Sequence, residues 1–397
     1  MSRRILFIDV SNNGCMVKLP SLFHQQGMNC LALSWDGDLL FKSSYLKRKY
    51  GVRDNEGQVH LSDLVQQTAF SLHHSNTDFL ITNEEQVIHK YLEICEAIKA
   101  RGPQNDKERK FIEVVAASLV TDKSLLLRPY SQDMAKKAGF PIPAHMPITS
   151  TEALVDVLET YPRPFYLKIS VSVGGQGVFK IEENDKREWI DHALSQFSPP
   201  SITRPYLAQT PVDGDEVTIS FAAYKGHLLG YTVARPLLTV VQRGASSYIE
   251  TLYRPQLEST LTNFCKLTSF NGFGGFDAIE TAGNRLPTVI EANMRLTHTV
   301  PACRQQGTDL VKLLCEAIKG KGITNHIPVH QQSTAKIALY PEEAMRLPES
   351  PNLENGLVSA PWSDPGAMRG LSHYIKRNIE YPPRSLEERY KIENEAK

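Results

Sequence analysis

The sequence lacks both a long apolar run and an excess of charge of either sign. No stretch reaches the roughly 18 consecutive apolar residues that a membrane-spanning helix needs. Lysine plus arginine and aspartate plus glutamate each total 44, and no long block of one sign occurs. The chain therefore has no overall field that would attract nucleic acid or an anionic membrane, and we expect neither as a partner. A small molecule bound at a local site is the expectation.

Cysteine is sparse and scattered. The six cysteines show no C-x-x-C spacing, so a zinc site, a redox motif and a disulfide framework are not predicted. Reduced thiols in a cytoplasmic protein are the interpretation. The N-terminal MSRRILFIDV enters the polar SNNG instead of a longer apolar region with a cleavage site, so it predicts a first strand and no signal peptide.

Two nucleotide-binding fingerprints are also missing. No G-x-G-x-x-G follows the first predicted strand, which weakens a dinucleotide-dependent oxidoreductase as an interpretation. The pattern G-x-x-x-x-G-K-[ST] fails as well, because the glycine-rich VSVGGQGV lies between two predicted strands and not between a strand and a helix. A P-loop is therefore not predicted.

The N-terminal part predicts an open parallel α/β domain over residues 1–120. RILFIDV is a compact apolar run, KLPSLFHQQG has helical spacing, and MNCLALSW is a second apolar run, which together indicate a strand, a helix and a strand. FLIT then predicts another strand, and the helix after it has Glu84 and Glu85 in its first turn and Gly102 at its end. This alternation is typical of a parallel sheet.

The rest of the chain predicts three further units. In the first, a helix over 132–137 ends at Gly139, the strands FYLKIS and VFKIEE pair antiparallel around the glycine-rich loop, and DKREWIDHALSQF is a helix. Alternating strands follow from SITRPYLAQTPVDG onward, and the proline-rich C-terminal segment predicts an appendage that packs on the core. The expected boundaries are 121–205, 206–330 and 331–397.

The glycine-rich loop and two lysines suit phosphate binding. Gly174, Gly175 and Gly177 let backbone N–H groups approach an anion, although such a loop taken alone is more often an ordinary turn. Lys168 lies inside an apolar strand and needs a partner, which a phosphate at the end of the strand would supply. Lys123 is a second candidate cation, with a solvated lysine at a helix start as the alternative.

A set of oxygen ligands is predicted near the glycines of GGFGGFD. In the strand TVIEANMR, Glu291, Asn293 and Arg295 share one face because side chains alternate along a strand. Asp277 ends the preceding strand, and the turn TAGNRLP brings the two strands together. Few, clustered oxygen donors suit Mg²⁺ that completes its shell with phosphate and water. Polar residues on the solvent face of a hairpin are the alternative.

From about residue 121 to 320 the sequence resembles the ATP-grasp superfamily, and the N-terminal part resembles the pre-ATP-grasp domain of carboxylate–amine ligases. The resemblance implies an α/β protein whose ATP-grasp part is α+β and two-lobed. It implies phosphate binding by Lys123, Lys168 and the GGQG loop, which includes Gln176. It places adenine against the main chain near Gln209 and Val212, ribose on Glu216, metal on Asp277, Glu291 and Asn293, and substrate carboxylate or acyl phosphate on Arg295.

The sequence departs from the family pattern at several positions. Gln209 stands where an acid is frequent, and Met294 stands where proline is frequent. His298 replaces a usual glycine or serine, so it either contacts substrate or fills space behind the metal strand. Arg235 and Arg243 lie where the superfamily often uses cations on the substrate, with solvated strand arginines as the alternative.

The resemblance implies a ligase that uses ATP and one or two Mg²⁺ ions, with Mn²⁺ as a substitute. The enzyme would activate a small carboxylate, such as an amino acid or a related acid, as an acyl phosphate, join it to an amine, and release ADP and phosphate. Alternatives are a carboxylase-like or kinase-like ATP-grasp enzyme and a catalytically silent nucleotide-binding regulator. The sequence does not identify the substrates, and the oligomeric state is open, with a homodimer among the alternatives.

Overall fold

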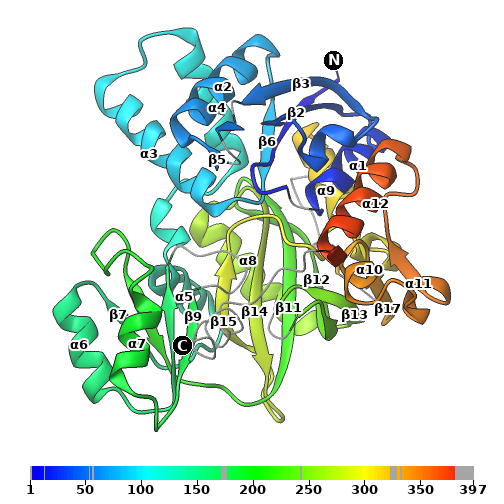
Figure 1. Cartoon of the computed structure of the whole chain (residues 1–397). Coiled ribbons are helices and arrows are strands. Elements are labelled where there is room, and N and C mark those ends of the chain that lie inside the picture. Colours follow the sequence, from blue (N-terminus) through cyan, green and yellow to red (C-terminus); the bar gives the residue numbers. More distant parts are fainter. Residues whose placement is uncertain are drawn as a thin grey trace.

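The computed structural model describes residues 2–12, 14–52, 54–55, 58–170, 177–241, 244–321, 329–330 and 333–380. Its N-terminal unit is a parallel sheet in the order β3-β2-β1-β6, at the top of Figure 1. The strands are β1 (Arg4–Ile8), β2 (Asn29–Trp35), β3 (Leu46–Val52) and β6 (Phe79–Thr82). Its helices are α1 (Leu19–Gln25), α2 (Leu61–His74), α3 (Glu85–Arg101) and α4 (Asp106–Ser118), and the short strands β4 (Asp54–Asn55) and β5 (Gln58–Val59) pair with each other. The predicted open parallel sheet is confirmed.

A smaller antiparallel sheet follows in the order β7-β10-β8-β9, at the lower left of Figure 1. Its strands are β7 (His145–Ile148), β8 (Phe165–Ile169), β9 (Val178–Ile181) and β10 (Tyr206–Gln209). The helices α6 (Thr151–Thr160) and α7 (Arg187–Leu194) supply apolar residues to its core. This core includes the buried side chains of Phe165, Leu167 and Ile190 and is separate from those of the rest of the chain. Helix α5 (Arg128–Ala138) leads into the sheet and ends at Gly139, whose φ of 106° explains the glycine.

The largest sheet carries the candidate site. Its order is β15-β14-β11-β12-β13-β17-β18, and β16 also pairs with β12. The strands are β11 (Asp215–Tyr224), β12 (His227–Thr239), β13 (Ser246–Leu252), β14 (Gly272–Glu280), β15 (Thr288–Asn293), β16 (Val329–His330), β17 (Lys336–Leu339) and β18 (Leu357–Ser359). The helices of this part are α8 (Glu258–Thr268), α9 (Leu310–Ile318), α10 (Glu342–Arg346), α11 (Pro351–Glu354) and α12 (Pro365–Glu380).

The N-terminal unit and the large sheet share their apolar core. Phe23 of α1 meets Phe7 of β1 and, edge to face, Phe273 of β14, with ring centroids 6.5 Å apart in the second pair. On the other face of the large sheet, Phe221, Phe264 and Phe276 form part of a second buried cluster, which also contains Leu6 of β1. Because burial of aromatic rings is a large stabilising term, the two units are held firmly against each other.

The C-terminal segment is part of this architecture. Strand β17 pairs with β13, and β18 extends the sheet further. Asp364 accepts hydrogen bonds from Ser43 and from the backbone N–H of Ser44, which ties the start of α12 to the N-terminal unit. The predicted α/β class is confirmed, with a smaller sheet and a large sheet following the N-terminal parallel sheet. The boundaries drawn at 120, 205 and 330 stay predictions.

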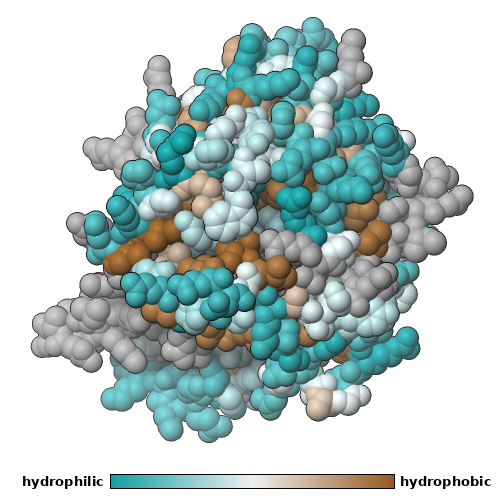
Figure 2. All heavy atoms as spheres, turned by 90° about the vertical axis from the view of Figure 1, so that its right-hand side faces the viewer, coloured by the Kyte–Doolittle hydropathy of each residue, from teal (hydrophilic) through white to brown (hydrophobic). Residues whose placement is uncertain are grey.

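Figure 2 shows the face over α10, α11 and α12, mostly hydrophilic with a band of hydrophobic atoms across its middle.

All six cysteines are buried and free of disulfide bonds. In the described part of the chain, no helix combines the length and the apolar character that crossing a membrane requires.

Candidate active site

Two neighbouring strands bring Asp277, Glu291 and Asn293 together. Asp277 of β14 lies opposite Glu291 of β15, and Gly275 lies opposite Asn293. Asn293 Nδ2 donates to Asp277 Oδ2 at 2.9 Å, and Thr218 Oγ1 donates to Asp277 Oδ1 at 3.1 Å. The antiparallel pairing expected for this hairpin is therefore present, with the three side chains on one face.

The electrostatics of this face favour a cation. Burial raises the pKa of Asp277 to about 6, and the negative charges of Glu291 and Glu216 add to the rise. Glu291 differs, since Arg128, Lys168 and Arg295 outweigh its burial and lower its pKa. The carboxylates of Asp277 and Glu291 repel each other in a buried place, which fits a divalent ion, because such an ion removes the repulsion. In the described part of the chain, no three His, Cys, Asp or Glu side chains are placed to hold a metal ion together.

Arg128 is a site residue that the sequence interpretation missed. It begins α5, its Nη1 lies 2.7 Å from Glu291 Oε2, and its Nε donates to the carbonyl of Ile169 at 2.9 Å. Its side chain is only 10% exposed. Ile169 ends β8, directly before the predicted phosphate loop, so the guanidinium joins the loop and the carboxylate face. The sequence signal was an arginine at the first position of a helix, which is common and points to no ligand by itself.

The carbonyl of Ile290 is a meeting point of three side chains. Lys168 Nζ donates to it at 2.9 Å, Gln132 Nε2 at 2.6 Å and Gln209 Nε2 at 3.3 Å. All three donors are buried. They come from β8, α5 and β10, so the carbonyl ties the smaller sheet and α5 to β15, the strand of Ile290.

Lys168 is a buried cation beside the carboxylates. Burial lowers its pKa to about 8, although Glu291 and Asp277 oppose the shift. Arg128 adds to the lowering, since two positive charges repel each other. A lysine with this environment gains most from an added anion, which raises its pKa and completes its charge balance.

Arg295 and His298 follow β15 and face other parts of the chain. Arg295 Nε lies 3.3 Å from Glu85 Oε1, at the start of α3 in the N-terminal unit. His298 Nδ1 lies 3.4 Å from Glu342 Oε1 of α10, and the charge of Lys18 lowers the pKa of this buried glutamate to about 2 against its desolvation. The histidine therefore has a partner of its own behind the metal strand, while its contact with substrate stays a prediction.

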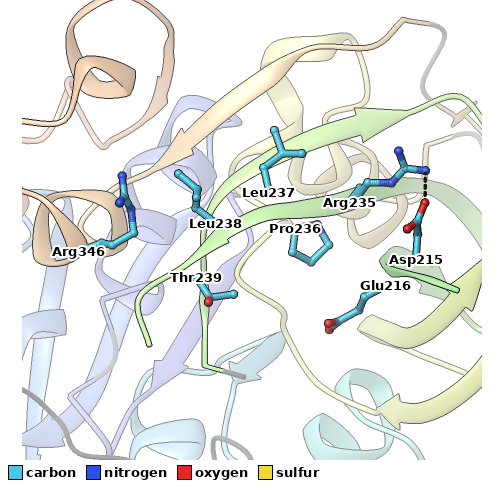
Figure 3. Close-up of a pocket in the computed structure, with 8 residues that line it drawn as sticks. All are labelled: Asp215, Glu216, Arg235, Pro236, Leu237, Leu238, Thr239 and Arg346. Atoms are coloured by element: carbon cyan, nitrogen blue, oxygen red, sulfur yellow. Dashed lines mark ion pairs between the residues drawn. The ribbon is translucent and has the colours of Figure 1, made fainter. Parts of the chain in front are cut away.

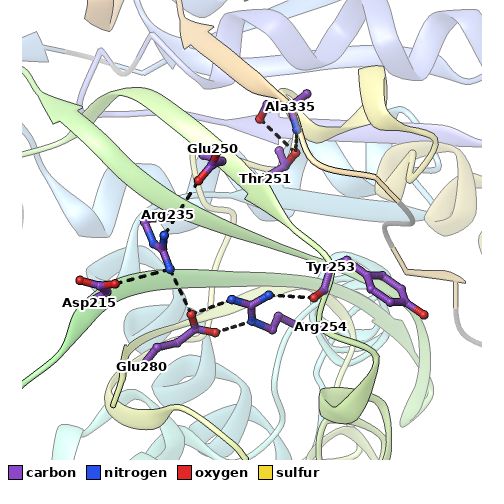
Figure 4. A network of polar contacts seen from close by, with 8 residues as sticks. All are labelled: Asp215, Arg235, Glu250, Thr251, Tyr253, Arg254, Glu280 and Ala335. Carbon is purple, nitrogen blue, oxygen red and sulfur yellow. Dashed lines mark hydrogen bonds and ion pairs between the residues drawn. The ribbon is translucent and has the colours of Figure 1, made fainter. Parts of the chain in front are cut away.

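Two predicted site residues lie elsewhere. Lys123 is at the surface, where its Nζ lies 2.6 Å from Glu96 Oε2. Arg235 lies on the face of the large sheet opposite Asp277, because its neighbour Ala234 pairs with Thr218, which in turn pairs with Asp277. There it contacts three carboxylates, as Figure 4 shows: Asp215 and Glu280 at 3.5 Å each and Glu250 at 4.0 Å. The structure brings neither cation to the face that carries Asp277 and Glu291, where Arg128 lies instead.

Glu216 is the residue predicted to bind the ribose. It is exposed on β11, and its negative charge reaches Asp277 and Glu291. It lines a pocket of about 560 Å³ at the start of β11 and the end of β12, and in Figure 3 its carboxylate points away from Arg235. Val212 is partly exposed in the connection before β11. Their contacts with ribose and adenine stay predictions.

Four predicted residues fall outside the described part of the chain: Gly174, Gly175, Gln176 and Arg243. Gly177 is described, and its carbonyl accepts a hydrogen bond from the backbone N–H of Ile169 at 2.8 Å. The base of the glycine-rich segment is thus fixed beside the residue that Arg128 also contacts.

Comparison with solved structures identifies the fold. No protein-family model matches the sequence, and no curated protein matches it. A biotin carboxylase from Campylobacter jejuni shares 13% identity, with a TM-score of 0.61 over 85% of this chain and 75% of that one. An N5-carboxyaminoimidazole synthetase from Staphylococcus aureus shares 11% identity, with a TM-score of 0.58 over 85% and 82%.

A third similar structure is an L-amino acid ligase from Bacillus licheniformis, at 14% identity and a TM-score of 0.54 over 84% of this chain and 79% of that one. All three are ATP-grasp enzymes. The chain therefore has the ATP-grasp fold, with the N-terminal parallel sheet that the resemblance implied. At these identities the likeness establishes the fold and leaves the reaction to the side chains.

Proposed function

We propose that the protein is an ATP-dependent ligase that activates a small carboxylate as an acyl phosphate and joins it to an amine. The observation that carries this proposal is the meeting of two buried cations, Lys168 and Arg128, with the carboxylate face of Asp277 and Glu291. Phosphoryl transfer needs positioned and neutralised phosphates more than a protein nucleophile. This arrangement supplies both kinds of charge in one place.

The reaction would run in two displacements. A carboxylate oxygen of the substrate attacks the γ-phosphorus of ATP, the bond to the β-phosphate oxygen breaks, and ADP leaves. The amine nitrogen then attacks the acyl carbon, phosphate leaves with the bonding electrons, and the nitrogen loses a proton. Lys168 and Arg128 would hold the transferred phosphoryl group, and Arg295 would hold the substrate carboxylate or the acyl phosphate.

Asp277, Glu291 and Asn293 would hold one or two Mg²⁺ ions, with Mn²⁺ as a substitute. When bound, the metal neutralises phosphate charge and orients the phosphates for in-line attack. The protein's own part is to keep both carboxylates on one face through the pairing of β14 with β15 and through the hydrogen bonds from Thr218 and Asn293.

The nucleoside would lie between the smaller and the large sheet. We assign adenine to the main chain near Gln209 and Val212 and the ribose hydroxyls to Glu216. The glycine-rich segment, with Gly174, Gly175, Gln176 and Gly177, would cover the phosphates. The buried side chain of Gln209 is occupied by the Ile290 carbonyl, which supports recognition of the base by backbone atoms alone.

A carboxylase-like reaction is the second candidate. Two of the similar structures are a biotin carboxylase and a carboxyaminoimidazole synthetase. Bicarbonate is itself a small carboxylate-like acid, so the same cations and metal ligands would serve its phosphorylation. The substrate test decides between the two acids.

The test is phosphate release from Mg-ATP in the presence of pooled amino acids, other small carboxylic acids or bicarbonate. The wild type is compared with Glu291→Gln, and Glu96→Gln at the surface serves as the matched control. Release that depends on one acid and is lost only in Glu291→Gln supports the proposal, and the product mass identifies the amine. Binding of ATP without release points to a nucleotide-binding regulator. Failure to bind Mg-ATP overturns the proposal.

A further inference from the structure

The N-terminal unit places two consecutive glutamates against the site. Strand β6 ends at Thr82, and Glu84 and Glu85 follow at the carboxyl end of the parallel sheet, where ligands of open α/β sheets commonly bind. Glu85 Oε1 lies 3.3 Å from Arg295 Nε. The charges of Arg128 and Glu291 also act on Glu85, so this carboxylate belongs to the same electrostatic neighbourhood as the metal ligands.

The ion pair of Glu85 with Arg295 is accessible to a small molecule. The side chains are 21% and 25% exposed, so each is mostly buried and still reachable from solvent. Burial raises the pKa of Glu85 even with Arg295 beside it. One guanidinium therefore does not compensate this carboxylate fully.

Glu84 is more deeply buried and less well compensated. Glu84 is 9% exposed, and no described residue brings a charged nitrogen within 4.0 Å of its carboxylate oxygens to form an ion pair. Burial raises its pKa against a hydrogen bond from Ser11 and the charge of Arg295. Next to it in the chain, the buried Oδ1 of Asn83 accepts no hydrogen bond from any described residue. Buried acceptors of this kind normally receive a hydrogen bond. The carboxyl end of β6 therefore has more hydrogen-bond acceptors than donors.

We propose that Glu85 and Glu84 bind the ammonium group of a zwitterionic amino acid whose carboxylate is held by Arg295. This inference rests on the proposed function and names the substrate class of that site. The ligand would replace one ion pair by two: carboxylate with Arg295, and ammonium with Glu85 and Glu84. Charge stays balanced, and the buried acceptors gain N–H donors.

The same geometry selects against plain carboxylic acids. An acid without an amino group would separate Arg295 from Glu85 and leave two buried glutamates without a cation. A site built to bond a polar group rejects the analogue that lacks it, because its own buried groups are left unpaired. We expect the amino acid to bind roughly tenfold or more tightly than its des-amino analogue.

The experiment measures binding directly, by ligand-observed NMR with the full-length protein and Mg-ADP. One pool contains common amino acids, and the other contains the matched des-amino acids, such as propionate for alanine. The wild type is compared with Glu85→Gln and Glu84→Gln, and Glu96→Gln on the same helix is the control. Thermal melting verifies that each variant is folded.

The expected result is that amino acids bind to the wild type and to Glu96→Gln, and that binding weakens roughly tenfold or more in Glu85→Gln and Glu84→Gln. Mg-ADP affinity should stay unchanged in all four proteins. Equal binding of both pools, or amino-acid binding that neither glutamate variant weakens, overturns the inference. Turnover of ATP with a plain acid but no amino-acid binding overturns it and leaves the ligase proposal standing. Amino-acid binding without ATP turnover would support the inference and overturn the ligase proposal.

Discussion

Arg128 and Glu291 form an ion pair at 2.7 Å between the first turn of α5 and the strand β15. The pair holds a candidate phosphate ligand against a candidate metal ligand. A nucleotide with its metal ion would offer each of them a stronger partner: phosphate oxygens for the guanidinium and a divalent ion for the carboxylate. The pair therefore keeps two opposite charges compensated in the same place where substrate charges would later lie.

Arg128→Lys and Arg128→Ala should both lower kcat for ATP turnover, the alanine variant by about 10² to 10³-fold. The guanidinium contacts both Glu291 and the carbonyl before the glycine-rich segment, and lysine replaces only its charge. Steady-state release of ADP measures the effect, and thermal melting separates it from misfolding.

Lys123→Ala is the matched comparison for Arg128. Lys123 pairs with Glu96 at the surface, so its removal should leave turnover within about twofold of the wild type, as expected of an exposed ion pair. A large loss in Lys123→Ala with wild-type turnover in Arg128→Ala would return the phosphate role to Lys123 and reject our assignment.

The sequence predicted the hairpin of Asp277 and Glu291 because local rules suffice there. Alternation along a strand fixes the shared face, and the turn between the strands limits their pairing. Lys168 was also found, since a lysine in an apolar strand already demands a partner. The parallel order around β1 followed from apolar runs separated by a helical segment.

Arg128 and Gln132 were not found, and the partner of Glu85 was not predicted; the reason is tertiary. Each lies at or near the start of a helix, where charged and polar residues are common and carry no specific signal. Their roles arise from contacts with Ile290, Glu291 and Arg295, which the chain reaches only after folding. The carboxylate partners of Arg235 were not predicted for a related reason, because the face of a long strand depends on its register with its neighbours.

Turnover should depend on the protonation of Lys168. Its pKa is lowered to about 8 in the free protein, and only the protonated form offers a charge to phosphate. We expect kcat/KM for ATP to fall as the pH rises above about 8, approaching tenfold per pH unit. In Lys168→Arg this decline should be absent, because guanidinium stays charged. A decline of equal slope in both proteins would assign the titration to another group.

Folding stability should respond to the titration of Asp38. Burial raises its pKa to about 6, above the ordinary value of an unfolded aspartate near 4. The folded state therefore favours the protonated form of Asp38. The contribution of this group to the unfolding free energy is complete below about pH 4 and is lost as the pH rises through 6. The loss amounts to at most about 3 kcal/mol of unfolding free energy.

Asp38→Asn tests that titration, because asparagine can still accept the hydrogen bond from the Leu40 N–H that caps the following turn. Its unfolding free energy relative to the wild type should rise between pH 4 and 7 in denaturant titrations. Asp36→Asn, at an exposed position of the same turn, should follow the wild type. If the unfolding free energy changes with pH in the same way in all three proteins, Asp38 does not titrate in this range.

Gly275 lets β14 approach β11 closely. A Cβ atom at this position would lie 2.8 Å from the carbonyl oxygen of Ile219 and 2.9 Å from Thr297 Cγ2. Because that carbonyl belongs to the backbone of β11, Gly275→Ala must widen the sheet, at a cost of about 1–3 kcal/mol. Gly275 also lies opposite Asn293 and two residues before Asp277, so the metal ligands would shift with it.

We therefore expect Gly275→Ala to lower the melting temperature and to raise KM for Mg-ATP together. Gly51→Ala is the control, since its nearest neighbour would be Asp36 Oδ1 at 3.9 Å, an ordinary contact on the edge strand β3. Lower stability with an unchanged KM would show that the ligands keep their places when the sheet widens. Melting and KM both at wild-type values would show that β11 and β14 are not packed as tightly as the structure indicates, since only a looser pair of strands accepts the extra methyl group without cost.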